Sequence, residues 1–158
     1  MTGAVDVLLN NAGVMGAMTS LEELDTDDAR KTHSINALGP LRVTGALLPQ
    51  LRQGKGKKVL HVTSGMGSIG DNTSGGAYGY RMSKAALNMG SRSMAADLKS
   101  DGIRVAVINP GWVKTDMGGS GAPIDVTTSA TGILAQLDAL SLETSGELLD
   151  YAGKRWPW

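Results

Sequence analysis

A tyrosine and a lysine separated by three residues form the sharpest chemical feature of the sequence. At a spacing of i and i+4, Tyr80 and Lys84 fall on one face of a helix, one turn apart. A phenol ordinarily has a pKa of about 10, but a neighbouring ammonium group favours the phenolate and lowers that pKa. The pair could therefore exchange protons at neutral pH, which general acid–base catalysis requires. Taken alone, the spacing also fits a packing tyrosine beside a solvated lysine.

A serine lies where a buried strand is expected to end. Ser64 follows the apolar run of residues 58–63, and open α/β sheets bind ligands at the carboxyl ends of their strands. Its hydroxyl could donate a hydrogen bond to the same substrate oxygen that Tyr80 protonates. Tyr78 is the rival phenol, but its i+4 partner is Met82, which carries no charge to tune it. Tyr80 is therefore the predicted acid–base group.

Strand and helix patterns alternate along the chain and would position these side chains. Short β-branched and apolar runs predict four strands, over residues 5–9, 58–63, 103–108 and 147–151. Apolar residues at helical spacing predict three helices, over residues 27–51, 77–99 and 127–140. Pro40 falls inside the first helix, so a bend or local break is expected at residues 37–40. The alternation is typical of a parallel sheet with helices on its faces, and we expect one α/β domain over residues 1–158.

Composition and charge exclude several classes of function. Acidic and basic residues balance at 15 each, so no net field would recruit nucleic acid or an anionic membrane. The chain has no cysteine, which excludes disulfides, thiolate metal sites and a cysteine nucleophile. His33 and His61 stand far apart and in no zinc-type spacing, so no metal site is expected. With no membrane-spanning apolar run and no signal pattern at the N-terminus, the expected location is the cytoplasm.

Five motifs in order connect this chemistry to a known family. They are Asn10-Asn11-Ala12-Gly13, Asn36 within residues 34–40, Ser64 in Ser-x-x-Gly, Tyr80 with Lys84, and Asn109-Pro110-Gly111. In identity, order and spacing they resemble the short-chain dehydrogenase/reductase family over essentially the whole chain. Three further segments, residues 70–76, 110–119 and 151–158, look like the C-factor and Sniffer-type carbonyl reductases of that family.

The resemblance implies a role for each matching residue. Tyr80 would be the general acid/base, Lys84 would lower its pKa and hold the nicotinamide ribose, and Ser64 would orient the substrate carbonyl. Asn36 would hold a water that relays protons toward Lys84, although an ordinary helix residue beside Pro40 is the alternative interpretation. The cofactor, NADP or NAD, would supply the hydride for a small carbonyl or alcohol substrate. The residues that would line the cofactor are Asn10, Asn11, Ala12, Gly13, Tyr80, Lys84, Pro110, Gly111, Val113 and Thr115.

The phosphate-binding opening of that family has no counterpart in this sequence. The opening consists of a strand, a Gly-rich turn and a helix that cradle the pyrophosphate. Residues 65–70 formally match G-x-G-x-x-G, but residues 71–76 are helix breakers, so we reject this match. We therefore expect the C-terminal half of a Rossmann-like doubly wound fold, with about four neighbouring parallel strands flanked by helices.

The first expected strand, from Val5 to Leu9, would then be an edge of the sheet. Its unpaired backbone groups and uncovered apolar side chains would favour pairing in a homodimer or with a complementary chain. The resemblance also favours a homodimer, because the family often dimerises through the helix expected at residues 77–99 and the helix before it.

Three functions remain open from the sequence. The first is an NAD(P)-dependent short-chain oxidoreductase, whose cofactor affinity would be weakened without the pyrophosphate-binding segment. The second is a cofactor-independent isomerase or lyase that keeps Tyr80 and Lys84 as a proton-transfer pair. The third is a non-catalytic interaction subunit in which the motifs persist by descent.

Overall fold

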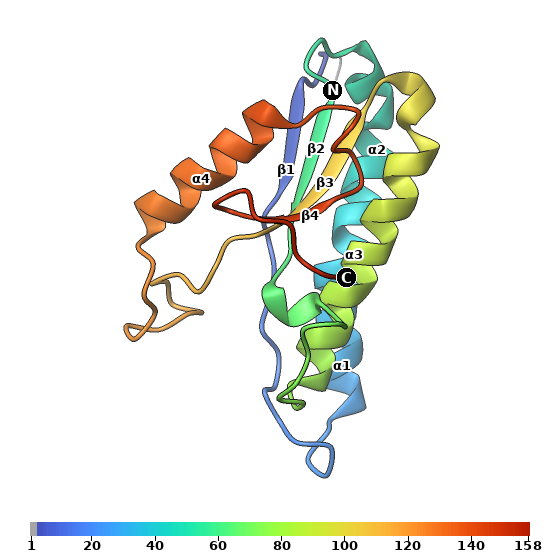
Figure 1. The fold of residues 1–158 in the computed structure, drawn as a ribbon. Coiled ribbons are helices and arrows are strands. Elements are labelled where there is room, and N and C mark those ends of the chain that lie inside the picture. Colours follow the sequence, from blue (N-terminus) through green and yellow to red (C-terminus); the bar gives the residue numbers. More distant parts are fainter. Residues whose placement is uncertain (1–2) are drawn as a thin grey trace.

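Four parallel strands form one sheet, in the order β1-β2-β3-β4, in the computed structural model, which describes residues 3–158 (Figure 1). The strands are β1 (Val7–Asn10), β2 (Lys58–Val62), β3 (Arg104–Asn109) and β4 (Leu148–Asp150). The predicted α/β class with four neighbouring parallel strands is confirmed. The predicted strand over residues 5–9 is displaced, because pairing with β2 begins at Val7 and continues to Asn10. Residues 1 and 2 of the expected domain lie outside the described residues.

Helices connect the strands, and local sequence sets where several of them begin. They are α1 (Thr26–His33), α2 (Gly39–Gln53), α3 (Tyr78–Asp97) and α4 (Val126–Ala139), with 3-10 turns at Gly65–Gly67 and Lys99–Asp101. Asp25 caps α1 by accepting from the amides of Asp27 and Asp28, and Asp125 caps α4 by accepting from the Thr128 amide. The G-x-G-x-x-G match at residues 65–70 forms only a 3-10 turn, which agrees with its rejection as a phosphate loop.

A π-helical segment, Ser34–Leu38, divides the helix that the sequence predicted over residues 27–51. The Gly39 amide bonds the Ser34 carbonyl five residues back, and Pro40 then lies in the first turn of α2. Proline suits that position because the first amides of a helix have no intrahelical acceptor. The expected break near Pro40 is confirmed, and it extends back to Ser34.

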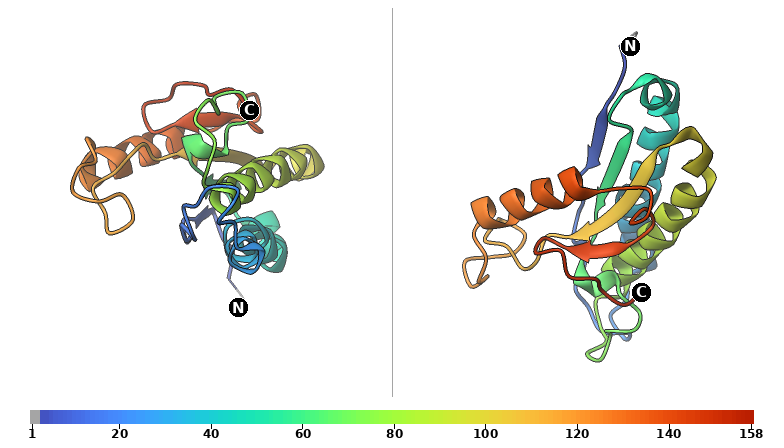
Figure 2. Two further views of the ribbon diagram at one scale, coloured as in Figure 1. Left: turned by 90° about the horizontal axis from the view of Figure 1, so that it is seen from below. Right: turned by 45° about the horizontal axis from the view of Figure 1, so that its top comes forward.

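Helices cover the two faces of the sheet unequally. Figures 1 and 2 show α2 and α3 side by side on one face and α4 crossing the other. The core between the sheet and the α2–α3 layer is formed by Leu51, Val59, Ala95, Leu98, Ile103 and Val105. The core beneath α4 is formed by Leu60, Val62, Ala106, Ile108, Leu137 and Leu140. Each fully buried valine, leucine or isoleucine of these two cores contributes about 1.5–3 kcal/mol to the free energy of unfolding.

Strand β1 lies at an edge of the sheet and is covered on one face only. Leu8 packs against the core beneath α2 and α3. Side chains alternate between faces along a strand, and Val7 and Leu9 remain 43% and 41% exposed on the α4 side. Within α4 itself only Ser129 and Leu137 are buried. The apolar edge expected from the sequence is therefore present, along Val7–Asn10.

Candidate active site

Tyr80 and Lys84 lie in the first turns of α3, buried against the end of β2. Both side chains are almost fully buried, at 8% and 4% exposure. Lys84 Nζ lies 5.7 Å from the centre of the Tyr80 ring and donates a hydrogen bond to the Val62 carbonyl at 2.9 Å. The helical spacing thus brings phenol and ammonium together, and the backbone of β2 fixes the lysine.

The electrostatics of this pair differ from the sequence prediction. Burial raises the pKa of Tyr80, and a hydrogen bond with the Ser64 side chain only partly opposes the shift. Burial also lowers the pKa of Lys84 to about 8. The expected lowering of the phenol pKa by Lys84 is therefore wrong for this structure. The reason is that both groups leave water, and burial penalises the charged form of each.

Ser64 lies two residues after the end of β2 and caps the 3-10 turn that follows it. Its Oγ accepts a hydrogen bond from the Met66 amide at 3.1 Å. On either side of it, Thr63 Oγ1 donates to Asn88 Oδ1 at 2.6 Å, and Asn88 Nδ2 donates to the Gly67 carbonyl at 3.1 Å. Asn88 is buried and lies one helical turn beyond the lysine of the pair. Helix α3 therefore holds the backbone that presents Ser64 as well as carrying the acid–base pair.

Asn36 is buried in the π-helical segment and is saturated by protein groups. Its Oδ1 accepts from the Val14 amide at 2.8 Å, and its Nδ2 donates to the Val14 carbonyl at 2.8 Å and to Ser83 Oγ at 3.0 Å. A methyl group on Gly13 would come 3.2 Å from Asn36 Oδ1 and 3.5 Å from Lys84 Nζ. The side chain of Asn36 thus positions the strand-to-helix connection beside Lys84, and its role in water relay stays a prediction.

The segment after β1 approaches Lys84 but does not present all its predicted cofactor residues to the same space. Asn11, Ala12 and Gly13 line a cavity in front of the acid–base pair. Asn10 points to the other side, where its Nδ2 lies 3.3 Å from Thr44 Oγ1 and 3.1 Å from His61 Nδ1. Asn10 is the last residue of β1, whereas residues 11–13 follow the strand and turn toward the cavity.

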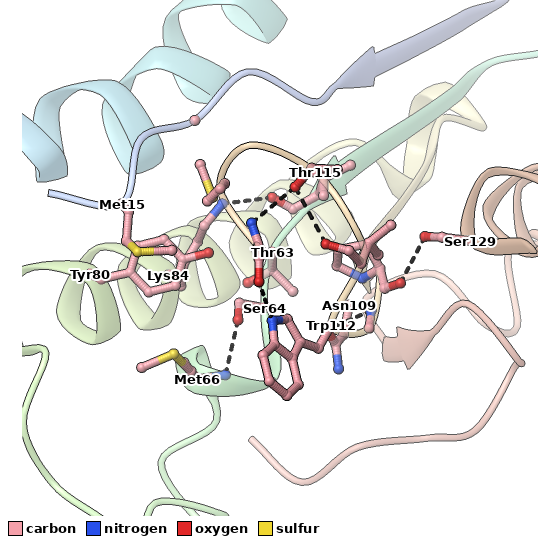
Figure 3. A pocket seen from close by; sticks show the side chains of 18 of the residues that line it. Met15, Thr63, Ser64, Met66, Tyr80, Lys84, Asn109, Trp112, Thr115 and Ser129 are labelled. Carbon is pink, nitrogen blue, oxygen red and sulfur yellow. Dashed lines mark hydrogen bonds between the residues drawn. The ribbon is translucent and has the colours of Figure 1, made fainter. Parts of the chain in front are cut away.

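One cavity of about 1050 Å³ collects most of the predicted residues (Figure 3). Its wall includes Ser64, Tyr80 and Lys84, together with the predicted loop residues Pro110, Gly111, Val113 and Thr115. Figure 3 shows these groups arriving from α3, from the end of β2 and from the loop after β3. Carboxyl ends of neighbouring parallel strands meet there, as they do in ligand sites of open α/β sheets.

A family model described as short chain dehydrogenase matches residues 1–123 of the chain. The chain belongs to this short-chain dehydrogenase family. Among curated relatives, C-signal of Myxococcus xanthus is 55% identical over 157 residues, which cover 99% of this chain and 95% of that protein. The 1-hydroxy-2-glutathionyl-2-methyl-3-butene dehydrogenase of Rhodococcus sp. (strain AD45) is 41% identical over 98% of this chain and 69% of its own.

Solved short-chain dehydrogenase structures superpose closely on this fold. Carbonyl reductase Sniffer of D. melanogaster gives a TM-score of 0.95 at 35% identity, covering 98% of this chain and 67% of Sniffer. The NADPH-bound carbonyl reductase from chicken fatty liver gives a TM-score of 0.93 at 32% identity, and the match covers 99% of this chain and 67% of the reductase. The chain therefore spans about two thirds of the length of these reductases.

Sequence analysis missed several residues that shape this short-chain dehydrogenase site. Asn88 received no role, although its i+4 spacing from Lys84 places it on the same helical stripe. Trp112 and Trp156 line the cavity, and both lie in segments that carried the resemblance without a role of their own. Ser129 Oγ donates to the Pro110 carbonyl at 2.7 Å and so ties the loop after β3 to α4. Contacts between distant segments leave no local periodicity from which to find them.

Neither a metal-binding cluster nor a membrane-spanning helix occurs among the described residues. No group of three or more histidine, aspartate or glutamate side chains there could hold a metal ion. No helix among residues 3–158 is long and apolar enough to cross a bilayer. The cytoplasmic location stays a prediction.

Proposed function

We propose that this site reduces small carbonyl compounds, and oxidises the corresponding alcohols, with NADP or NAD as the hydride carrier. The observation that carries the proposal is the meeting of Ser64, Tyr80 and Lys84 at one wall of a single cavity. The same cavity is lined by residues that the resemblance assigns to the cofactor: Asn11, Ala12, Gly13, Pro110, Gly111, Val113 and Thr115.

Proton transfer is the step that this chain's own residues perform. Burial raises the pKa of Tyr80, so the phenol is protonated at neutral pH and suited to donate. It gives its proton to the carbonyl oxygen as negative charge develops there, while the Ser64 hydroxyl donates a hydrogen bond to the same atom. The Lys84 ammonium, 5.7 Å from the ring centre, then stabilises the phenolate that remains. The protonated phenol is the form of Tyr80 that carbonyl reduction requires.

The residues present fit the nicotinamide end of the cofactor. Gly13 leaves free the space beside Lys84 Nζ that a side chain would fill, and Lys84 is the donor to the nicotinamide ribose in this family. When bound, the dinucleotide would supply the hydride. The NADPH-bound carbonyl reductase and a similar short-chain dehydrogenase/reductase from Burkholderia multivorans with bound NADP support NADP as the cofactor. The Gly-rich segment after β2 forms a 3-10 turn and does not itself open a helix, so it offers no helix N-terminus to a pyrophosphate.

Two measurements test this proposal. NADPH fluorescence is titrated against the purified chain, and reduction of an aromatic ketone by NADPH is followed in single turnovers. Tyr80→Phe should slow reduction by about 10²–10⁴-fold while leaving NADPH binding unchanged, because only the proton donor is lost. Ketone reduction at the same rate in wild type and Tyr80→Phe, or no reduction at saturating NADPH, would falsify the proposal.

An interaction subunit without redox turnover is the second candidate. The observation that favours it is strand β1, which among the described residues pairs with β2 alone and leaves one apolar face half exposed. Under this proposal the edge strand β1 pairs with a second copy or a complementary chain, and Val7 and Leu9 pack in that interface. Light scattering of wild type and Leu9→Lys tests it. A monodisperse wild-type monomer would contradict pairing in a homodimer.

A further inference from the structure

Large apolar side chains make up much of the cavity wall around the acid–base pair. Its large side chains are Met15, Met18, Met66, Met117, Trp112 and Trp156, several of which Figure 3 shows around Ser64 and Tyr80. Methionine and tryptophan present adaptable, weakly hydrated surfaces that suit apolar and aromatic groups. A bulky uncharged compound would therefore bury its surface well in this space.

The two cations of the cavity wall both donate hydrogen bonds to protein acceptors. Arg81 donates from Nη2 to Ser74 Oγ at 2.8 Å, from Nε to the Gly75 carbonyl at 3.2 Å and from Nη1 to the Met66 carbonyl at 3.4 Å. Lys84 is held by the Val62 carbonyl. The third charged residue on the wall, Asp71, would repel an anion. A substrate carboxylate or phosphate would meet an arginine already bonded to three protein acceptors and an almost fully buried lysine, so losing its water in this largely apolar cavity costs it free energy.

Trp156 comes from the far C-terminus and lies directly against the residue after Ser64. A methyl group on Gly65 would come 2.8 Å from Cζ3 and 3.0 Å from Cη2 of the Trp156 indole. The indole therefore borders the cavity at the point where the substrate carbonyl would meet the Ser64 hydroxyl.

The indole is fixed in place by the chain that turns back along β4. Trp156 Nε1 donates to Asp150 Oδ2 at 3.2 Å, and the Trp156 amide donates to the Leu148 carbonyl at 2.9 Å. Asp150 is itself oriented, because its Oδ1 accepts from the Ala152 and Lys154 amides at 2.9 Å each. Lys154 Nζ lies 5.9 Å from the indole centre. The ring is therefore a preorganised wall rather than a freely rotating side chain.

The last two residues fasten the loop that follows Ser64. Ser68 Oγ donates to the Pro157 carbonyl at 2.7 Å, and the Gly70 amide donates to the Trp158 carbonyl at 2.7 Å. Both acceptors are backbone atoms, so the Trp158 side chain is not needed for these contacts. These two hydrogen bonds hold the C-terminal segment against the loop that follows Ser64.

We propose that Trp156 determines substrate specificity, selecting uncharged carbonyl compounds that carry an apolar ring and excluding their anionic counterparts. This inference rests on the proposed carbonyl site, and it names the class of substrate that the site accepts. The ring of the substrate would pack along the Trp156 indole while its oxygen lies between Ser64 and Tyr80.

Calorimetric titration without cofactor tests the inference on the full chain. The probes are 1-acetonaphthone, a naphthyl ketone, and 1-naphthoate, an anion of the same shape. The ketone should bind at least about tenfold more tightly than the anion, and Trp156→Ala should weaken ketone binding about tenfold through loss of ring packing. Trp156→Phe should retain most of the affinity, and Trp158→Ala should stay within about twofold of wild type, because only its backbone contacts the loop.

The outcomes separate this inference from the proposed function. Equal ketone affinity in wild type and Trp156→Ala, or naphthoate binding as tight as the ketone, overturns the role of Trp156. If Trp156→Ala unfolds, Trp156→Phe and the two ligands still decide the matter. Selective ketone binding that depends on Trp156, with no NADPH-dependent reduction, would leave the specificity pocket standing and reject the redox function. NADPH-dependent reduction that is indifferent to Trp156 would do the reverse.

Discussion

His61 makes the stability of this protein depend on pH in a way that one substitution can isolate. The imidazole is fully buried in β2, and its Nδ1 lies 3.1 Å from Asn10 Nδ2. Since the amide nitrogen is a donor, Nδ1 accepts and the proton of the neutral ring sits on Nε2. Nε2 finds no hydrogen-bond partner among residues 3–158. A second proton would place a charge in the core and set two donors against each other, and burial lowers the pKa of His61 to about 4.

The sign and size of the effect follow from this pKa. The unfolded chain takes up the proton near the ordinary pKa of 6.5, whereas the folded chain resists until about 4. The folded state is thus fully favoured above pH 6.5 and loses stability as the pH falls through this window. Relative to pH 7, the loss is about 2 kcal/mol at pH 5 and about 3 kcal/mol at pH 4.

Urea unfolding of wild type and His61→Gln at pH 7 and pH 5 measures this loss directly. Other groups titrate in the same range, but they do so in both proteins and cancel in the difference. We expect wild type to lose about 2 kcal/mol more than His61→Gln between these pH values. Thr44→Val removes the other partner of Asn10 without adding or removing a titrating group, so its profile should run parallel to wild type. Equal losses in wild type and His61→Gln would refute the reasoning.

Three further substitutions test the packing around the site, each by urea unfolding. Lys84→Met removes a buried cation whose pKa is lowered from 10.5 to about 8; its stability relative to wild type should be highest at pH 7 and fall by about 2.5 kcal/mol by pH 10, where the lysine is neutral in the folded chain but still mostly charged in the unfolded chain. A pH-independent difference would contradict this. Asn36→Ala strands the amide and carbonyl of Val14 and should cost about 2–4 kcal/mol; a loss below about 1 kcal/mol would show that water replaces the side chain. Gly67→Ala places a methyl 2.7 Å from Lys84 Cβ and should cost about 1–3 kcal/mol, whereas Gly45→Ala meets nothing within 4 Å and should be neutral or stabilising; similar effects at both glycines would count against the close packing.

Local patterns in the sequence were sufficient for the architecture and for the central pair. Strand and helix alternation predicted the parallel sheet, and Pro40 predicted an interrupted helix. The i and i+4 spacing placed Tyr80 and Lys84 one turn apart because α3 is a regular helix there. Ser64 could be placed beside them because it ends a buried strand. These features depend on dihedral preferences and periodicity within a few residues, which the sequence carries directly.

Tertiary structure alone decided the protonation and the outer wall of the site. The pKa of Tyr80 is raised rather than lowered, because its value depends on how much of the chain removes the phenol from water. Asn10 lies against His61 and Thr44, and Asn36 is hydrogen-bonded by Val14 and by Ser83 of α3. These contacts form only when separate segments of the chain pack together. Trp156, near the C-terminus, packs against Gly65 in the middle of the sequence. Burial and long-range contact are properties of the whole packed chain, and no short stretch of residues contains them.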